Sequence, residues 1–143
     1  MTKISVLVIT LNAFSPLVSV DIGKFDLPFF LNNQVLESLV CHKDLSQPLV
    51  KALECTREKE AIYATKMLFN SGGCYADRKI YGTNRWSQHK YGRAIDINVP
   101  TPFSKVVNRQ HPELVKCFKA QGFEWGGDWK NKDYMHFQIP LKT

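Results

Sequence analysis

Two stretches of the chain place apolar residues at the three- and four-residue spacing of an amphipathic helix. The first covers residues 44–60, and the second covers residues 111–122 and ends on a glycine, a typical helix stop. The apolar positions are Leu49, Val50, Ala52 and Leu53 in the first stretch and Leu114, Val115 and Phe118 in the second. The pattern therefore predicts two helices.

Three other stretches have the composition or the alternation of β-strands. Residues 62–69 form the first, which the turn-prone sequence 70–73 closes. In residues 94–98 and again in residues 134–139, polar and apolar side chains alternate, so that each strand has one polar and one apolar face. We expect an α+β fold, with a small, mainly antiparallel sheet and helices packed on one side.

The first twenty residues have the layout of a secretory leader, in which a single lysine precedes an apolar run too short to span a membrane. We expect residues 1–20 to be a signal peptide, residues 21–37 a linker or N-terminal arm, and residues 38–143 one domain. The alternative is that the apolar run supplies the first strand of the folded domain.

At 143 residues, with 44% hydrophobic and 22% charged residues, the chain fits a single folded domain and not a disordered one. The net charge of +6 favours an anionic partner. The basic residues are dispersed, which argues against nucleic-acid binding. We expect a monomer that neither binds nucleic acid nor inserts stably into a membrane.

The four cysteines include no C-x-x-C pair, which argues against a zinc ribbon and, in an exported chain, for two disulfides. Cys55 and Cys117 lie in predicted helices, whereas Cys41 and Cys74 lie beside predicted strands. We expect the pairs 41–74 and 55–117, one of three possible connectivities. In a reducing cytoplasm the four side chains would instead be buried thiols.

Asp96 and His136 each lie on the polar face of a predicted strand. His89 is a third candidate ligand if the chain turns at Gly92, because residues seven apart on one strand point to opposite faces. Two histidines and a carboxylate suit a catalytic zinc with one position open for water. Asp133 is placed to act as general base on that water without binding the metal.

Each of these residues also has a purely structural interpretation. His136 alone, in an aromatic strand, is more often a core residue, and a half-buried Asp96 needs an ion-pair partner if it binds no metal. Trp125 and Trp129 are either core residues or a wall of a substrate cleft. The candidate ion-pair partners of Asp96 are Arg78, Arg85 and Arg93.

The sequence from Cys74 to Asn98 includes Ser-Gln-His-Lys-Tyr-Gly-Arg-Ala-Ile-Asp at 87–96, and a second block includes Glu-Trp-Gly-Gly-Asp-Trp at 124–129 and Asp-Tyr-Met-His at 133–136. Together they resemble the family of zinc D-Ala-D-Ala carboxypeptidases and L-alanyl-D-glutamate endopeptidases. This family includes vancomycin-resistance dipeptidases and phage endolysins, and is similar in fold to the hedgehog signalling domain. The resemblance covers about residues 38–140, in the correct order.

The resemblance implies a hedgehog- or DD-peptidase-like fold in which the three candidate ligands hold one zinc ion per chain and Asp133 is the catalytic base. It adds Arg78 as the cation that steadies the substrate or its oxyanion. It gives Ser87, two residues before the first histidine, a supporting role. Independently of the resemblance, we expect Trp125 and Trp129 to take substrate-binding or supporting roles. The aspartate at 133, where the dipeptidase branch has glutamate, is more similar to the endolysin and endopeptidase branch.

The function that the resemblance implies is zinc-dependent hydrolysis of an amide bond in peptidoglycan stem peptides, of the D-Ala-D-Ala carboxypeptidase or L-Ala-D-Glu endopeptidase type. We expect an exported protein, periplasmic or extracellular, or one that is cytoplasmic before lysis if it is a phage endolysin. The alternative is a non-catalytic, hedgehog-like zinc-binding module that binds a partner.

Overall fold

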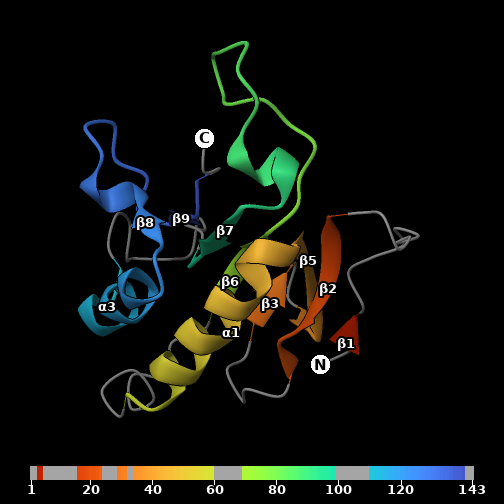
Figure 1. Ribbon diagram of the computed structural model, residues 1–143, viewed down its shortest axis with the longest axis vertical. Helices are drawn as coiled ribbons and strands as arrows, with labels where there is room; N and C mark the ends of the chain where they lie inside the picture. Colours follow the sequence, from red (N-terminus) through yellow and green to blue (C-terminus); the bar gives the residue numbers. More distant parts are fainter. Residues whose placement is uncertain are drawn as a thin grey trace.

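The computed structural model describes residues 3–4, 16–23, 29–31, 34–59, 69–98 and 110–140. Within these ranges the chain forms two sheets, two α-helices and two short 3-10 helices (Figure 1). The strands are β1 Lys3–Ile4, β2 Leu17–Asp21, β3 Phe29–Leu31, β4 Gln34–Leu36, β5 Ser38–His42, β6 Phe69–Gly73, β7 Ala94–Ile97, β8 Glu124–Trp125 and β9 His136–Gln138. The helices are α1 Lys43–Arg57, η2 Gln88–Tyr91, α3 Pro112–Ala120 and η3 Gly126–Asp128.

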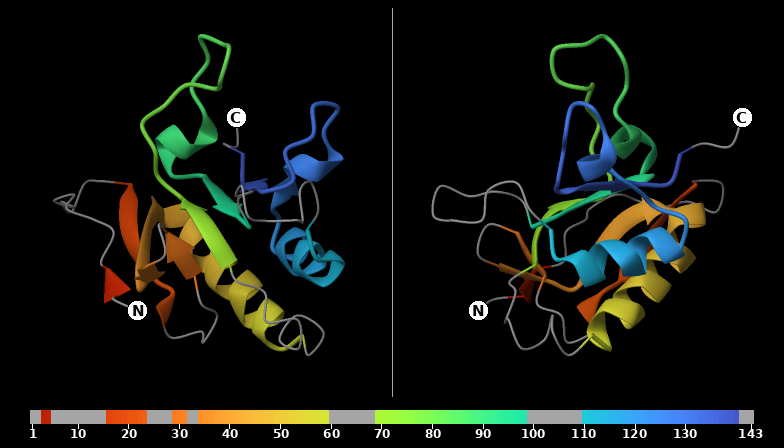
Figure 2. Two further views of the ribbon diagram at one scale, coloured as in Figure 1. Left: turned by 180° about the vertical axis from the view of Figure 1, so that it is seen from behind. Right: turned by 90° about the vertical axis from the view of Figure 1, so that its left-hand side faces the viewer.

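The larger sheet has seven strands in the order β1-β4-β3-β6-β7-β9-β8, and β2 pairs with β5 in a second sheet. Among these pairings β1–β4 and β3–β6 are parallel and the others are antiparallel. The helix α1 lies behind the strands in the left view of Figure 2. The predicted α+β fold, with a mainly antiparallel sheet, is confirmed.

Helix α1 begins where the side chain of His42 accepts a hydrogen bond from the backbone N–H of Asp44, at 3.0 Å. Such a cap satisfies one of the N–H groups that have no partner inside the helix. The face of α1 that packs into the core consists of Leu45, Leu49, Ala52, Leu53 and Thr56. The helix predicted over 44–60 is therefore confirmed, although it ends at Arg57.

Helix α3 begins in the same way, since the His111 side chain accepts from the N–H of Glu113 at 3.2 Å and Pro112 occupies the first turn. The chain leaves this helix through Gly122, whose φ of 89° is a conformation that glycine adopts most easily. The predicted helix and its glycine stop are confirmed.

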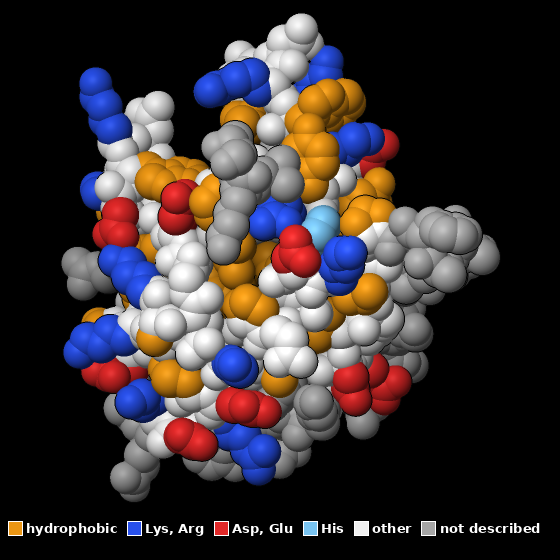
Figure 3. All heavy atoms as spheres, in the orientation of Figure 1, with side chains coloured by type: hydrophobic (Ala, Val, Ile, Leu, Met, Phe, Trp, Pro, Cys, Tyr) orange, Lys and Arg blue, Asp and Glu red, His pale blue; other side chains and the backbone are white. Residues whose placement is uncertain are grey.

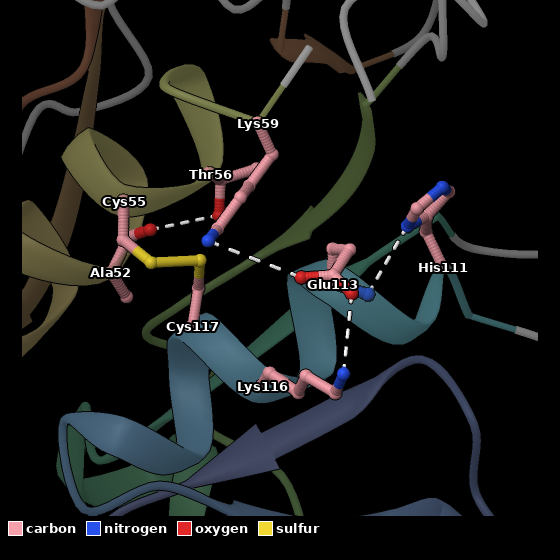
Figure 4. The surroundings of a disulfide bond; sticks show 8 residues. All are labelled: Ala52, Cys55, Thr56, Lys59, His111, Glu113, Lys116 and Cys117. Atoms are coloured by element: carbon pink, nitrogen blue, oxygen red, sulfur yellow. Dashed lines mark hydrogen bonds and ion pairs between the residues drawn. A yellow bond between two sulfur atoms is a disulfide. The ribbon is translucent and has the colours of Figure 1, made fainter. Parts of the chain in front are cut away.

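The two helices lie side by side and are linked covalently by the disulfide between Cys55 and Cys117, with Cα atoms 5.6 Å apart (Figure 4). An ion pair between Lys59 and Glu113, at 4.0 Å, links the same two segments. The second disulfide joins Cys41 in β5 to Cys74, directly after β6. Both predicted disulfides are present in the structure.

The core lies between the helices and the sheets. It combines the buried face of α1 with Leu114 and Phe118 from α3, and with Ile95 and Phe137 from β7 and β9. The rings of Phe118 and Phe137 have centroids 4.7 Å apart, so α3 packs directly against the strand that carries His136. This packing fixes the position of β9 relative to the helices.

One element of the sequence interpretation is wrong. The predicted turn at 70–73 is part of β6, which pairs with β7. The strand register shifts between Ser71 and Gly73, and Gly73 has a φ of 88°. The positive φ of this glycine therefore allows a β-bulge within β6 and does not form a hairpin turn. Most of the strand predicted at 62–69 lies outside the described residues.

The N-terminal part of the described chain takes part in the fold. Strand β2 pairs with β5 along its length, from Leu17 opposite His42 to Asp21 opposite Ser38, and Ile22 is fully buried. Strands β3 and β4 lie within the range predicted as an arm. The division into a leader at 1–20, an arm at 21–37 and a domain at 38–143 stays a prediction. None of the described helices is long and apolar enough to cross a bilayer.

Candidate metal centre

Three elements bring His89, Asp96 and His136 together. The first is in η2, the second in β7 and the third in β9, where it stands directly opposite Asp96 in the strand register. All three are buried, and each offers a ligand atom within 4.8 Å of the others. His89 Nε2 lies 3.2 Å from Asp96 Oδ2, and His136 Nδ1 lies 3.2 Å from Asp96 Oδ1.

His89 reaches this group because it is not on the strand that carries Asp96. It lies in η2, which is capped by the side chain of Ser87 and ends at Gly92 with a left-handed φ of 66°. A Cβ on Gly92 would meet the backbone nitrogen of His42 at 2.6 Å, so both the dihedral angle and the space require glycine there. The expected turn between His89 and Asp96 is confirmed.

Each histidine ring is oriented by a hydrogen bond on the side away from Asp96. His89 Nδ1 lies 2.7 Å from the backbone oxygen of Cys74, and His136 Nε2 lies 2.9 Å from Oε1 of Gln138. Both partners are oxygen acceptors, so each of these ring nitrogens donates. The remaining nitrogens, Nε2 of His89 and Nδ1 of His136, therefore face the carboxylate with lone pairs when the rings are neutral.

This arrangement fits a bound metal ion. Metal-binding histidines commonly donate their second N–H to a carbonyl or carboxylate, which fixes the tautomer and the ring orientation. Nε2 of His89 is buried and makes no hydrogen bond to any of the described residues, although Asp96 lies close to it. Two lone pairs that face a carboxylate require a cation between them, either a proton or a metal ion. Two histidines and one carboxylate are a ligand set that suits zinc.

The pKa shifts of Asp96 and His136 also indicate that a positive charge is favoured between the three side chains. Burial would raise the pKa of the Asp96 carboxyl, but the interactions of this carboxyl with the rings of His136 and His89 outweigh burial and hold the pKa well below its usual range. Burial would lower the pKa of His136, but its bonds to Asp96 and Gln138 outweigh burial and raise it. Each partner thus favours the charged form of the other.

The arginines considered as ion-pair partners of Asp96 differ in position. Arg78 Nη2 lies 3.9 Å from Asp96 Oδ2, and about half of the Arg78 side chain is exposed. Arg93 is buried, and its guanidinium bonds to the carbonyls of Ile139 and Pro140 and to Asp44. Arg85 is exposed, in the segment between β6 and η2. Arg78 is therefore the cation placed beside the centre.

Asp133 lies just before β9 and is half-buried. Its backbone N–H donates to the carbonyl of Gly126 at 2.9 Å, and its own carbonyl accepts from the N–H of His136 at 3.2 Å. Burial raises the pKa of its carboxyl, against the opposing charge of His136, and the charge of Asp96 raises it further. The charges of all three candidate ligands therefore act on the Asp133 carboxyl, which is not itself one of the three converging groups.

The supporting residues have separate positions. Ser87 caps the 3-10 helix of His89, and its hydroxyl accepts from the His89 N–H at 3.2 Å. Trp125 packs against the core and stacks on Phe137, and its indole N–H donates to the carbonyl of Tyr134 at 2.9 Å. Trp129 instead lies against His136, with ring centroids 5.2 Å apart. Of the two tryptophans, Trp129 is the one beside the candidate metal centre.

Sequence reasoning missed two groups that orient the histidines, the carbonyl of Cys74 and the side chain of Gln138. A backbone carbonyl leaves no trace in the sequence. Gln138 could have been found, because it lies two residues after His136 on the same face of a strand. It is held in turn by Glu124 across the β8–β9 pair, to which its amide donates at 3.1 Å.

Fold and site together define a small α+β domain with a buried His-Asp-His centre, and comparison with known proteins indicates its class. Residues 81–139 match the family described as D-alanyl-D-alanine carboxypeptidase, a range that includes all three candidate ligands and Asp133. The chain is also similar to the peptidoglycan L-alanyl-D-glutamate endopeptidase CwlK of Bacillus subtilis (strain 168). The identity is 25% over 120 residues, which cover 76% of this chain and 69% of the relative. These matches confirm the predicted family resemblance and support a peptidase.

Proposed function

We propose that this protein is a zinc-dependent peptidase that hydrolyses an amide bond in the stem peptides of peptidoglycan. The observation that carries the proposal is the convergence of His89, Asp96 and His136, with both rings oriented so that one lone pair of each faces the carboxylate. Zinc held there, one ion per chain, would lower the pKa of a bound water towards about 7 and polarise the scissile carbonyl.

The chain's own residues supply the remaining chemistry. Asp133 accepts the proton of the attacking water and returns it to the leaving amine. Its burial raises its pKa, which strengthens it as a base relative to an exposed aspartate. Arg78, beside Asp96 and partly exposed, balances the negative charge that develops on the substrate carbonyl oxygen.

Between the two bonds considered, we favour the one between L-Ala and D-Glu. The similarity to CwlK, which is named for that activity, supports this choice. The aspartate at position 133 supports it as well, because it resembles the endopeptidase branch of the family. The matching family is described as D-alanyl-D-alanine carboxypeptidase, so the terminal D-Ala-D-Ala bond is the alternative substrate and should be assayed beside the L-Ala-D-Glu bond.

We further propose that the protein acts in the periplasm or outside the cell. Two disulfides within the described residues support an oxidising compartment. The net charge of +6 would help the protein to associate with an anionic cell wall.

Digestion of purified peptidoglycan, followed by mass spectrometry of the released fragments, tests the proposal. We expect cleavage by the wild-type protein with zinc bound at one equivalent. We expect His136→Ala to lose both zinc and cleavage, and Asp133→Ala to keep zinc and lose cleavage. A wild-type protein that binds zinc but cuts no stem peptide would instead support the non-catalytic module. Unchanged turnover in Asp133→Ala would refute the assigned base.

A further inference from the structure

Residues 75–87, which we call the projecting loop, connect β6 to η2 and extend from the body of the molecule (Figures 1 and 2). The loop has a defined structure. Its two arms bond to each other through Ile80 N–H to the carbonyl of Arg85 at 2.9 Å, and Ser87 N–H to the carbonyl of Arg78 at 3.2 Å. Lys79 Nζ also donates to the side chain of Asn84 at 2.6 Å. The side chains of the loop are therefore presented on a small, ordered hairpin.

The projecting loop and the adjoining η2 carry all four large hydrophobic side chains that are exposed among the described residues. Tyr81 is 99% exposed, Trp86 45%, Ile80 40% and Tyr91 37%. Side chains of this size normally pack against the protein, and a group of them left in solvent is typical of an interaction surface. Figure 3 shows hydrophobic and basic side chains together on this projecting end.

Basic residues accompany these aromatic rings. The segment 77–91 contains four basic residues and a single acidic residue, Asp77, which pairs with Lys90 at 2.7 Å. The ammonium groups of Lys79 and Lys90 lie 5.1 and 4.6 Å from the centre of the Trp86 ring. These cation–π contacts hold the indole in place while part of it stays exposed. The basic residues are Arg78, Lys79, Arg85 and Lys90.

The loop is also close to the metal centre. Arg78 at its base approaches Asp96 at 3.9 Å, and Ser87 at its other end caps the helix that holds His89. A polymer that lies on the loop would therefore have its nearest side branches beside the metal ligands. A protein partner bound to the loop would block access of the substrate to the centre. For a peptidase, the substrate polymer is therefore the better candidate occupant.

We infer that residues 80–86 of the projecting loop are a docking surface for the peptidoglycan polymer, separate from Arg78, Asp133 and the metal ligands; this inference rests on the proposed function. Tyr81 and Trp86 pack against the C–H faces of the sugar rings of the glycan strand, and Arg85 pairs with carboxylates of the attached stem peptides. The hydroxyl and indole N–H groups of the two aromatic residues suit a polar ligand better than the acyl chains of a membrane would.

Two variants separate docking from cleavage. In Tyr81→Ala/Trp86→Ala and in Arg85→Ala, we expect kcat/KM on a short soluble stem peptide to stay within about twofold, because neither variant changes a metal ligand or the base. On intact peptidoglycan we expect kcat/KM to fall at least about tenfold in the aromatic variant, which corresponds to about 1.4 kcal/mol. Arg57→Ala, which removes an exposed arginine from the end of α1, is the matched control. It should change kcat/KM neither on the short stem peptide nor on intact peptidoglycan.

Binding gives an independent measure. Each loop variant is combined with Asp133→Ala so that the polymer is not cut, and co-sedimentation with insoluble peptidoglycan is measured. The aromatic variant should lose binding to whole peptidoglycan and to glycan strands stripped of stem peptides, whereas the Arg85 variant should lose binding to whole peptidoglycan only.

Three results would overturn the inference. The first is unchanged polymer binding in the aromatic variant, and the second is an equal loss on the short peptide and the polymer, which would place the loop in the catalytic machinery. The third is loss of binding to anionic lipid vesicles with polymer binding intact, which would indicate a membrane partner. A wild-type protein that cuts neither substrate would refute the proposed function, while the binding measurements would still decide the docking surface.

Discussion

The disulfide between Cys55 and Cys117 holds α1 and α3 together, and its removal should cost the protein a large part of its stability. The perturbation is the double substitution Cys55→Ala/Cys117→Ala, which leaves no unpaired thiol and places no new polar group at Cys117, a buried position. Because α3 packs through Phe118 against Phe137 in β9, the effect should reach the strand that carries His136.

The size of the effect follows from the length of the loop that the disulfide closes. The two cysteines are 62 residues apart in the sequence. For a loop of this length the chain-entropy relation gives about 14 cal/mol/K, or about 4 kcal/mol at 25 °C. A domain of ordinary stability unfolds with about 5 to 15 kcal/mol, so the loss is a large fraction of the total. We expect the melting temperature to fall by about 10 to 15 °C.

The assay is urea denaturation and thermal unfolding of the zinc-free proteins, so that metal binding does not mask the difference. Lys59→Ala is the matched control, because it removes the ion pair with Glu113 that joins the same two segments. Both partners of this pair are partly exposed, so the control should lose less than about 1 kcal/mol. A double alanine variant that unfolds within about 1 kcal/mol of the wild type would refute the reasoning.

Three further predictions concern the metal centre. Gln138→Leu removes the acceptor for His136 Nε2, and the zinc dissociation constant, measured by chelator competition, should rise by about 10- to 100-fold; Glu124→Gln, which leaves that contact in place, should have a smaller effect. In Gly126→Ala the new methyl group would collide with the carbonyl oxygen of Asp133, and we expect kcat to fall while zinc content is unchanged. In the zinc-free protein the Asp133 carboxyl should titrate above its ordinary value of 3.8, because burial favours the protonated form. Carbon NMR of labelled aspartates measures this pKa, and a result at or below 3.8 would contradict the assignment. Since the base works only when ionised, activity should fall as the pH falls.

Much of the fold and the centre could be predicted because their signals are local. The helical spacing after residue 44 and the stop at Gly122 locate both helices. The alternation around Asp96 and His136 places both side chains on polar faces of strands. Gly92 was expected to turn the chain towards His89, and its left-handed conformation does so.

The features that the sequence predicted wrongly or did not predict depend on contacts between residues distant in the sequence. The glycine-rich segment at 70–73 has the composition of a turn, yet the neighbouring strand β7 pairs with it and the glycine is used for a bulge. Neither the pairing of β2 with β5 nor the carbonyl of Cys74 beside His89 has a signature in its own segment. Tertiary contacts decided these positions, and local composition did not.

Asp96 and His136 are paired across β7 and β9, so the hydrogen-bond register between these two strands sets the relative position of the two side chains. A shift of either strand by one residue would turn one of these side chains to the opposite face of the sheet, so insertions or deletions within the two strands should be intolerable. Length changes at the tip of the projecting loop leave that alignment untouched. Variants designed for new wall chemistries should therefore diversify the loop and leave the strand pair intact.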